Sequence, residues 1–89
     1  MLAHKVILVV EDNEINRTLL VTLLSEEYRV LEAENGQAAL DVLKEHGEEI
    51  ALILLDITMP VMDGYTFLSI IREEPAFSAI PVIVTTQSD

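Results

Sequence analysis

Three acidic residues stand at the ends of the two most apolar runs in this 89-residue sequence. Glu11 and Asp12 directly follow the run 6–10 (Val-Ile-Leu-Val-Val). Asp56 directly follows the run 51–55 (Ala-Leu-Ile-Leu-Leu). Short runs that are apolar throughout are typical of parallel strands buried on both faces. Open α/β sheets bind their ligands at the carboxyl ends of such strands, so these acids stand where a site would form.

The chemistry of this group depends on whether the two strands are neighbours, because the three carboxylates would then converge. Two carboxylates about 4 Å apart repel by about 4 kcal/mol at an effective dielectric constant near 20. A hard divalent cation such as Mg²⁺ removes that repulsion. Beside such an ion one carboxylate can attack phosphorus, and Asp56 is the best nucleophile candidate. The alternative is that the three acids are helix caps and solvated loop residues.

Helical and strand patterns alternate along the chain, which supplies the elements that must position these acids. Strands are predicted at 6–10, 28–33, 51–55 and 82–86, and helices are predicted to begin after Asn13, at 35–36 and after Gly64. Gly47 is predicted to end the second helix in the left-handed conformation. This alternation predicts an α/β fold: a doubly wound parallel sheet with helices on both faces.

Composition narrows the classes of partner. The formal net charge is −11, from 16 acidic and 5 basic residues, which disfavours nucleic acid and anionic membrane surfaces as partners. The chain has no cysteine for disulfides or thiolate metal sites, and no apolar run long enough to cross a bilayer. One small, soluble, cytoplasmic domain with no membrane segment is therefore expected.

Three segments together resemble the receiver domain of bacterial two-component response regulators. They are Glu11-Asp12 after its apolar run, Asp56 within 54–64 (Leu-Leu-Asp-Ile-Thr-Met-Pro-Val-Met-Asp-Gly), and 81–86 (Pro-Val-Ile-Val-Thr-Thr). The resemblance extends over essentially the whole chain. It implies a flavodoxin-like fold with parallel strands in the order 2-1-3-4-5. It also implies a signalling domain that catalyses at most its own phosphorylation and dephosphorylation, and no enzyme for an external substrate.

The same resemblance implies a role for each residue of the site. Asp56 would accept a phosphoryl group from a sensor histidine kinase. Asp12, Asp56 and the backbone carbonyl of Thr58 would bind Mg²⁺ directly, and Glu11 would act mostly through water. Thr85 would be the switch hydroxyl that moves toward the aspartyl phosphate. On spacing alone Thr85 would be an ordinary strand residue.

The family's pattern continues beyond Thr86 with two helices and a fifth strand that supplies a lysine. Residues 1–89 are therefore expected to form a truncated receiver domain, with strand order 2-1-3-4 and an exposed fourth-strand edge that favours a homodimer. The alternative to a phosphoacceptor is a dimerising fragment with an intact metal site but no competent phospho-switch. An aspartyl-phosphate phosphatase is disfavoured, because such enzymes have a second acid where this chain has Thr58.

Overall fold

The computed structural model describes residues 5–56 and 64–85. Strands and helices alternate throughout this described part, as the sequence predicted. The elements, in chain order, are β1 (Val6–Val10), α1 (Glu14–Leu24), β2 (Arg29–Ala33), α2 (Gly36–His46), β3 (Ile50–Asp56), α3 (Gly64–Glu73) and β4 (Val82–Thr85).

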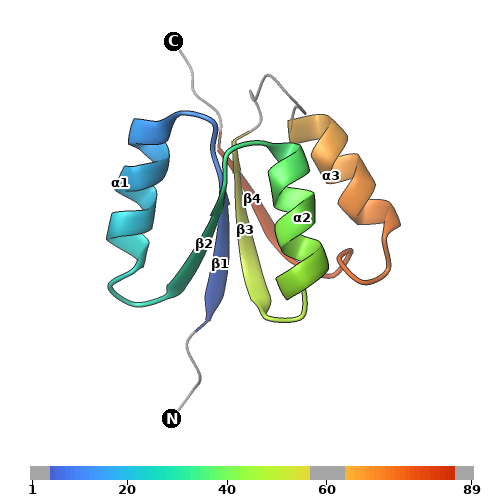
Figure 1. Cartoon of the computed structure of the whole chain (residues 1–89). Helices are drawn as coiled ribbons and strands as arrows, with labels where there is room; N and C mark the ends of the chain where they lie inside the picture. The colour runs from blue at the N-terminus through green and yellow to red at the C-terminus, as the bar shows by residue number, and fades with distance from the viewer. Residues whose placement is uncertain (1–4, 57–63, 86–89) are drawn as a thin grey trace.

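The strands form one parallel sheet in the order β2-β1-β3-β4. Helix α1 covers one face of this sheet, and α2 and α3 cover the other (Figure 1). The prediction of a doubly wound, flavodoxin-like sheet is confirmed. Strand β1 has β2 and β3 as neighbours on its two edges, and all five of its residues are buried. This burial on both faces explains why all five residues are apolar.

The hydrophobic core lies between the sheet and the helices α2 and α3. Its large, fully buried side chains come from the strands β1 and β3 and from the helices α2 and α3, and less than 2% of each is exposed. Among them are Leu8, Leu43, Ile53, Leu55, Phe67 and Ile71. Leu55 belongs to this core and Asp56 is the next residue of β3, so the core holds the strand end that carries the carboxylate.

Helices α1 and α2 each begin at an asparagine cap; the sequence predicted the cap at Asn13 and a helix start at 35–36. The side chain of Asn13 accepts a hydrogen bond from the backbone N–H of Asn16 at 2.9 Å. The side chain of Asn35 accepts one from the backbone N–H of Ala38 at 2.8 Å. Each cap satisfies a helix N–H that has no partner within the helix.

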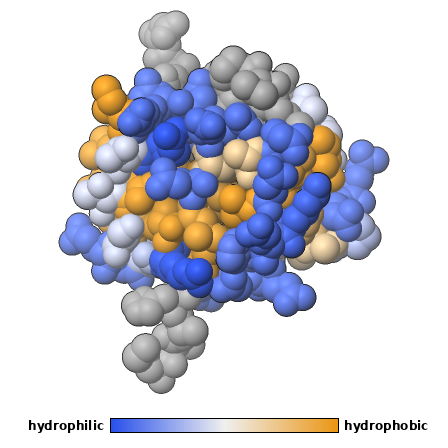
Figure 2. All heavy atoms as spheres, viewed as in Figure 1, coloured by the Kyte–Doolittle hydropathy of each residue, from blue (hydrophilic) through white to orange (hydrophobic). Residues whose placement is uncertain are grey.

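Helix α1 is apolar on its outer flank as well as toward the sheet, and none of its residues is fully buried. Ile15, Leu19 and Leu23 are 78%, 57% and 58% exposed. The space-filling view shows apolar surface over α1 and along the neighbouring sheet (Figure 2). On the sheet, a groove of about 540 Å³ is lined in part by Leu54 and Ile83. The exposed large apolar side chains of this face are therefore those of α1 together with Ile83 of β4.

The predicted left-handed conformation of Gly47 is wrong. Gly47 has φ −52° and ψ −35°, a right-handed helical conformation, and its N–H donates to the carbonyl of Leu43 at 2.8 Å. Glycine is needed there for space. A Cβ atom would lie 2.6 Å from the Leu43 carbonyl oxygen and 2.8 Å from the ring of Phe77.

Candidate functional site

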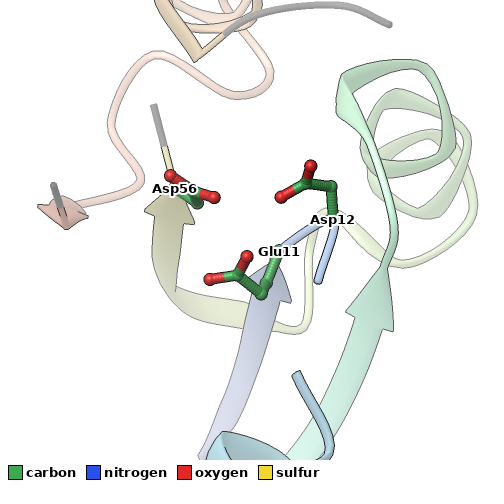
Figure 3. Close-up of side chains that lie close together, drawn as sticks. All are labelled: Glu11, Asp12 and Asp56. Atoms are coloured by element: carbon green, nitrogen blue, oxygen red, sulfur yellow. The ribbon is translucent and has the colours of Figure 1, made fainter. Parts of the chain in front are cut away.

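Parallel pairing of β1 with β3 brings the three acids together at one edge of the sheet. Val10 is paired with Leu55, so Glu11 and Asp56 follow on adjacent strands. The close-up shows the carboxylates of Glu11, Asp12 and Asp56 directed toward a common space (Figure 3). One ligand oxygen from each lies within 4.8 Å of the others. Two elements far apart in the sequence thus build one acidic site.

Burial differs among the three acids. Glu11 and Asp56 are only 5% and 3% exposed, whereas Asp12 is exposed. The backbone N–H of Asn13 donates to Glu11 Oε2 at 3.1 Å, which holds this side chain in place. The site therefore has two carboxylates set into the protein and one that faces solvent.

The pKa of Glu11 is raised from 4.5 to about 7. Burial is the largest cause, because it penalises the charged form. The neighbouring carboxylates of Asp56 and Asp12 raise the pKa further, and the hydrogen bond from Asn13 opposes them. The pKa shift therefore reflects first the cost of burying the charged Glu11 carboxylate and then its repulsion by the neighbouring acids.

These residues fit a small divalent cation. Mg²⁺ takes oxygen ligands at 2.0–2.1 Å, so two ligands on opposite sides of the ion lie about 4 Å apart. The carboxylate oxygens of Glu11, Asp12 and Asp56 are already within 4.8 Å of one another. Small side-chain movements would complete such a shell, with water filling the remaining positions. The donor set is all oxygen, which favours Mg²⁺ or Mn²⁺ over metals that prefer nitrogen or sulfur.

Thr85 lies at the same edge of the sheet, on the other side of β3. The β3–β4 register pairs Thr85 with Asp56, and the Thr85 hydroxyl donates to the backbone carbonyl of Leu55 at 3.3 Å. The structure thus places four of the five predicted site residues at one sheet edge. The remaining residue, Thr58, lies outside the described residues.

Arg17, in α1, contacts the site and was not identified by sequence reasoning. Its Nη1 donates to the backbone carbonyl oxygen of Glu11 at 2.9 Å, and its Nε donates to Glu32 Oε1 at 3.0 Å. The Arg17 side chain is only 15% exposed. The available sequence signal was its position: Arg17 is the only basic residue in the segment 6–28, among apolar and acidic neighbours.

A parallel sheet in this order, with an acidic cluster at the carboxyl ends of its two central strands, defines a flavodoxin-like domain with a candidate cation site. The chain belongs to the response regulator receiver domain family, whose sequence model matches residues 7–89. This family comprises signalling domains and not classical enzymes. Within the described residues, no helix is long and apolar enough to cross a membrane.

Two relatives come from Dictyostelium discoideum. The hybrid signal transduction protein dokA is 42% identical over 87 residues, which cover 96% of this chain and 5% of dokA. Hybrid signal transduction histidine kinase M is 39% identical over 84 residues, which cover 90% of this chain and 4% of that protein. The chain therefore spans only a small part of the length of these relatives.

Two solved structures are similar over nearly the whole chain. The phosphorylated cyanobacterial phytochrome response regulator RcpA is 34% identical with a TM-score of 0.85, and the match covers 97% of this chain and 67% of RcpA. The Mn²⁺-bound form of response regulator Rcp1 is 35% identical with a TM-score of 0.80, covering 94% of this chain and 66% of Rcp1.

Proposed function

We propose that this chain is a phosphoacceptor domain that receives a phosphoryl group on Asp56 with the help of Mg²⁺. The observation that carries this proposal is the convergence of three carboxylates, two of them buried, at the carboxyl ends of β1 and β3. Buried like charges are costly, and sites that keep them are commonly functional. The phosphorylated RcpA and Mn²⁺-bound Rcp1 structures support both parts of the proposal by similarity.

The transfer proposed here is a displacement at phosphorus. A carboxylate oxygen of Asp56 attacks the phosphorus of a phosphohistidine, an O–P bond forms, and the N–P bond breaks. The electron pair of that bond returns to the imidazole of the donor, which takes up a proton. The core beneath β3 holds Asp56 in place, because Leu55 is fully buried and anchors the end of the strand.

Each remaining residue of the site has a proposed supporting role. Asp12, Asp56 and the backbone carbonyl of Thr58 would hold the cation, with Glu11 acting through water. The bound ion would offset negative charge on the phosphoryl oxygens. The Thr85 hydroxyl now donates to a backbone carbonyl, and we propose that it exchanges this acceptor for the phosphoryl group on Asp56.

The proposed phosphoryl donor is a sensor histidine kinase. Its support is that hybrid histidine kinase M contains a segment similar to this chain. Small molecules can replace the kinase in a test: acetyl phosphate, and phosphoramidate, which presents the N–P bond found in phosphohistidine.

The experiment is to incubate the chain with each donor and Mg²⁺, and to measure the intact mass. One added phosphoryl group is expected on the parent, and none on Asp56→Asn or when EDTA replaces Mg²⁺. Glu26→Gln, a change at an exposed acid beyond the other end of α1, is the matched control and should be phosphorylated like the parent. Phosphorylation of Asp56→Asn to the same extent would refute the assignment. Mg²⁺ binding without phosphorylation would favour a metal-binding fragment with no phospho-switch.

We also propose that two copies associate through β4. Within the described residues, β4 pairs with β3 on one side only, and Ile83 and Val84 are 52% and 39% exposed. Such an edge offers unpaired backbone groups to another strand. Analytical ultracentrifugation should show a dimer that Ile83→Lys disrupts, whereas Ile70→Lys, on the exposed side of α3, leaves it intact. A parent chain that sediments as a monomer at high concentration would refute this pairing.

A further inference from the structure

We infer that Arg17 is a positioning residue that fixes the Glu11–Asp12 peptide and thereby sets the affinity of the site for its cation. This inference rests on the proposed function, because it concerns the same cation site. The hydrogen bond from Arg17 Nη1 goes to the backbone carbonyl of Glu11, on the chain segment that carries two of the three carboxylates.

The backbone of Glu11 is held on both sides. Its N–H donates to the carbonyl of Ala33 at 3.0 Å, which continues the pairing between β1 and β2 past the end of β1. Its carbonyl oxygen accepts from Arg17 Nη1 at 2.9 Å. With Arg17 removed, the bond from the Glu11 N–H would still hold the preceding peptide, but the Glu11–Asp12 peptide would lose the bond to its carbonyl and gain rotational freedom. Both acidic side chains would then be less well placed to bind one ion.

Arginine suits this position because its guanidinium is planar and has several donors in a fixed arrangement. Nη1 binds the carbonyl of Glu11, while Nε binds the carboxylate of Glu32 on β2. One side chain therefore ties α1 to the end of β1 and to β2. The Glu32 side chain is 53% exposed, so water screens its charge and this charge contributes little to cation binding.

Charge and position predict opposite effects, which makes the inference testable. If Arg17 acted only through its charge, its removal would strengthen cation binding, because a nearby positive charge would be lost. If Arg17 positions the Glu11–Asp12 peptide, its removal weakens binding. Loss of groups that orient metal ligands costs about 10- to 100-fold in metal affinity. Since Arg17 acts through a backbone carbonyl, we expect the lower end, about tenfold.

The experiment is isothermal titration of Mn²⁺ and Mg²⁺ into the parent chain and three variants. Arg17→Met keeps the unbranched stem and should bind Mn²⁺ about tenfold more weakly. Arg17→Lys keeps the charge but not the two-armed donor geometry, and its affinity should fall between those of the parent and Arg17→Met. Glu32→Gln is the matched control: it removes the ion pair but leaves the bond from Arg17 to Glu11, so its affinity should change by no more than about twofold.

Circular dichroism establishes that each variant is folded at the titration temperature. If Arg17→Met does not fold, Arg17→Lys and Glu32→Gln still distinguish a charge role from a positioning role. A charge role predicts that Arg17→Lys binds the cation with unchanged affinity, whereas a positioning role predicts weaker binding. Unchanged or tighter Mn²⁺ binding by the folded Arg17 variants would overturn the inference. Absence of Mn²⁺ binding by the parent would overturn it together with the cation site.

The assay distinguishes this inference from the proposed function. Mn²⁺ affinity is measured without any phosphoryl donor, so a parent chain that binds Mn²⁺ but is not phosphorylated would refute the phosphoacceptor proposal alone. In a parent chain that is phosphorylated, the Arg17 variants should need a higher Mg²⁺ concentration for half-maximal rate. Their rate at saturating Mg²⁺ should stay close to that of the parent.

Discussion

Replacing Glu11 by Gln should stabilise the metal-free protein at pH 8 and have little effect at pH 4.5. The folded protein raises the pKa of Glu11 from 4.5 to about 7, so between these pH values it binds more protons than the unfolded chain. The free energy of unfolding must then fall as pH rises through this window. Glutamine has no titrating group there, so Glu11→Gln removes this part of the fall.

The magnitude follows from the size of the shift. Each pKa unit corresponds to about 1.36 kcal/mol, so a rise from 4.5 to about 7 would amount to about 3 kcal/mol. Asp12 is exposed and opens the site to water, which screens the repulsion. We therefore expect Glu11→Gln to exceed the parent in stability by about 1–2 kcal/mol at pH 8 in EDTA.

Urea unfolding followed by circular dichroism, in EDTA at pH 4.5, 6 and 8, measures this difference. Glu26→Gln is the matched control, because it removes one exposed acid outside the site. Its free energy of unfolding should not gain on that of the parent between pH 4.5 and pH 8 as that of Glu11→Gln does. If the proposed cation site is correct, saturating Mg²⁺ should reverse the ranking, because the Glu11 carboxylate would help hold the ion through water and glutamine would not. A Glu11→Gln variant that is less stable than the parent at pH 8 in EDTA would refute the idea that the buried, charged Glu11 carboxylate costs stability at this site.

Three further changes test the surroundings of the site. Mg²⁺ at a hundred times its dissociation constant should raise the free energy of unfolding of the parent by about 2.7 kcal/mol, and an unchanged urea midpoint would argue against binding to the folded state. Asn13→Ala should lower the free energy of unfolding, measured by thermal unfolding, by about 1 kcal/mol, because α1 loses its cap. An unchanged free energy of unfolding would mean that water replaces the cap. Gly47→Ala should lower the free energy of unfolding by about 1–3 kcal/mol, because the added Cβ would meet the Leu43 carbonyl and the Phe77 ring. An unchanged free energy of unfolding would show that both groups can move aside.

Most of the fold was predictable from the sequence because its signals are local. The runs 6–10 and 51–55 are apolar throughout, and that pattern is typical of central strands in a parallel sheet. Asn13 and Asn35 mark helix starts through bonds to residues three positions away. The order of the strands came from the resemblance to receiver domains, and the structure confirms it for β1 to β4.

The failure at Gly47 has a physical reason. A glycine after a helical segment commonly takes the left-handed conformation, so the local pattern favoured that prediction. In the structure the ring of Phe77 occupies the space beside Gly47, and only a residue without a side chain fits there. Phe77 follows 30 positions later in the chain, so no local pattern reports this contact.

The sequence by itself determined the element types and placed Glu11, Asp12 and Asp56 at strand ends, because periodicity and chain adjacency are properties of neighbouring residues. Only the tertiary structure decided how these acids interact. The pairing of β1 with β3 buries Glu11 beside Asp56 and raises its pKa, and the packing of α1 sets Arg17 against the Glu11 carbonyl. Burial and charge separation depend on distances between elements, and these distances exist only after the chain has folded.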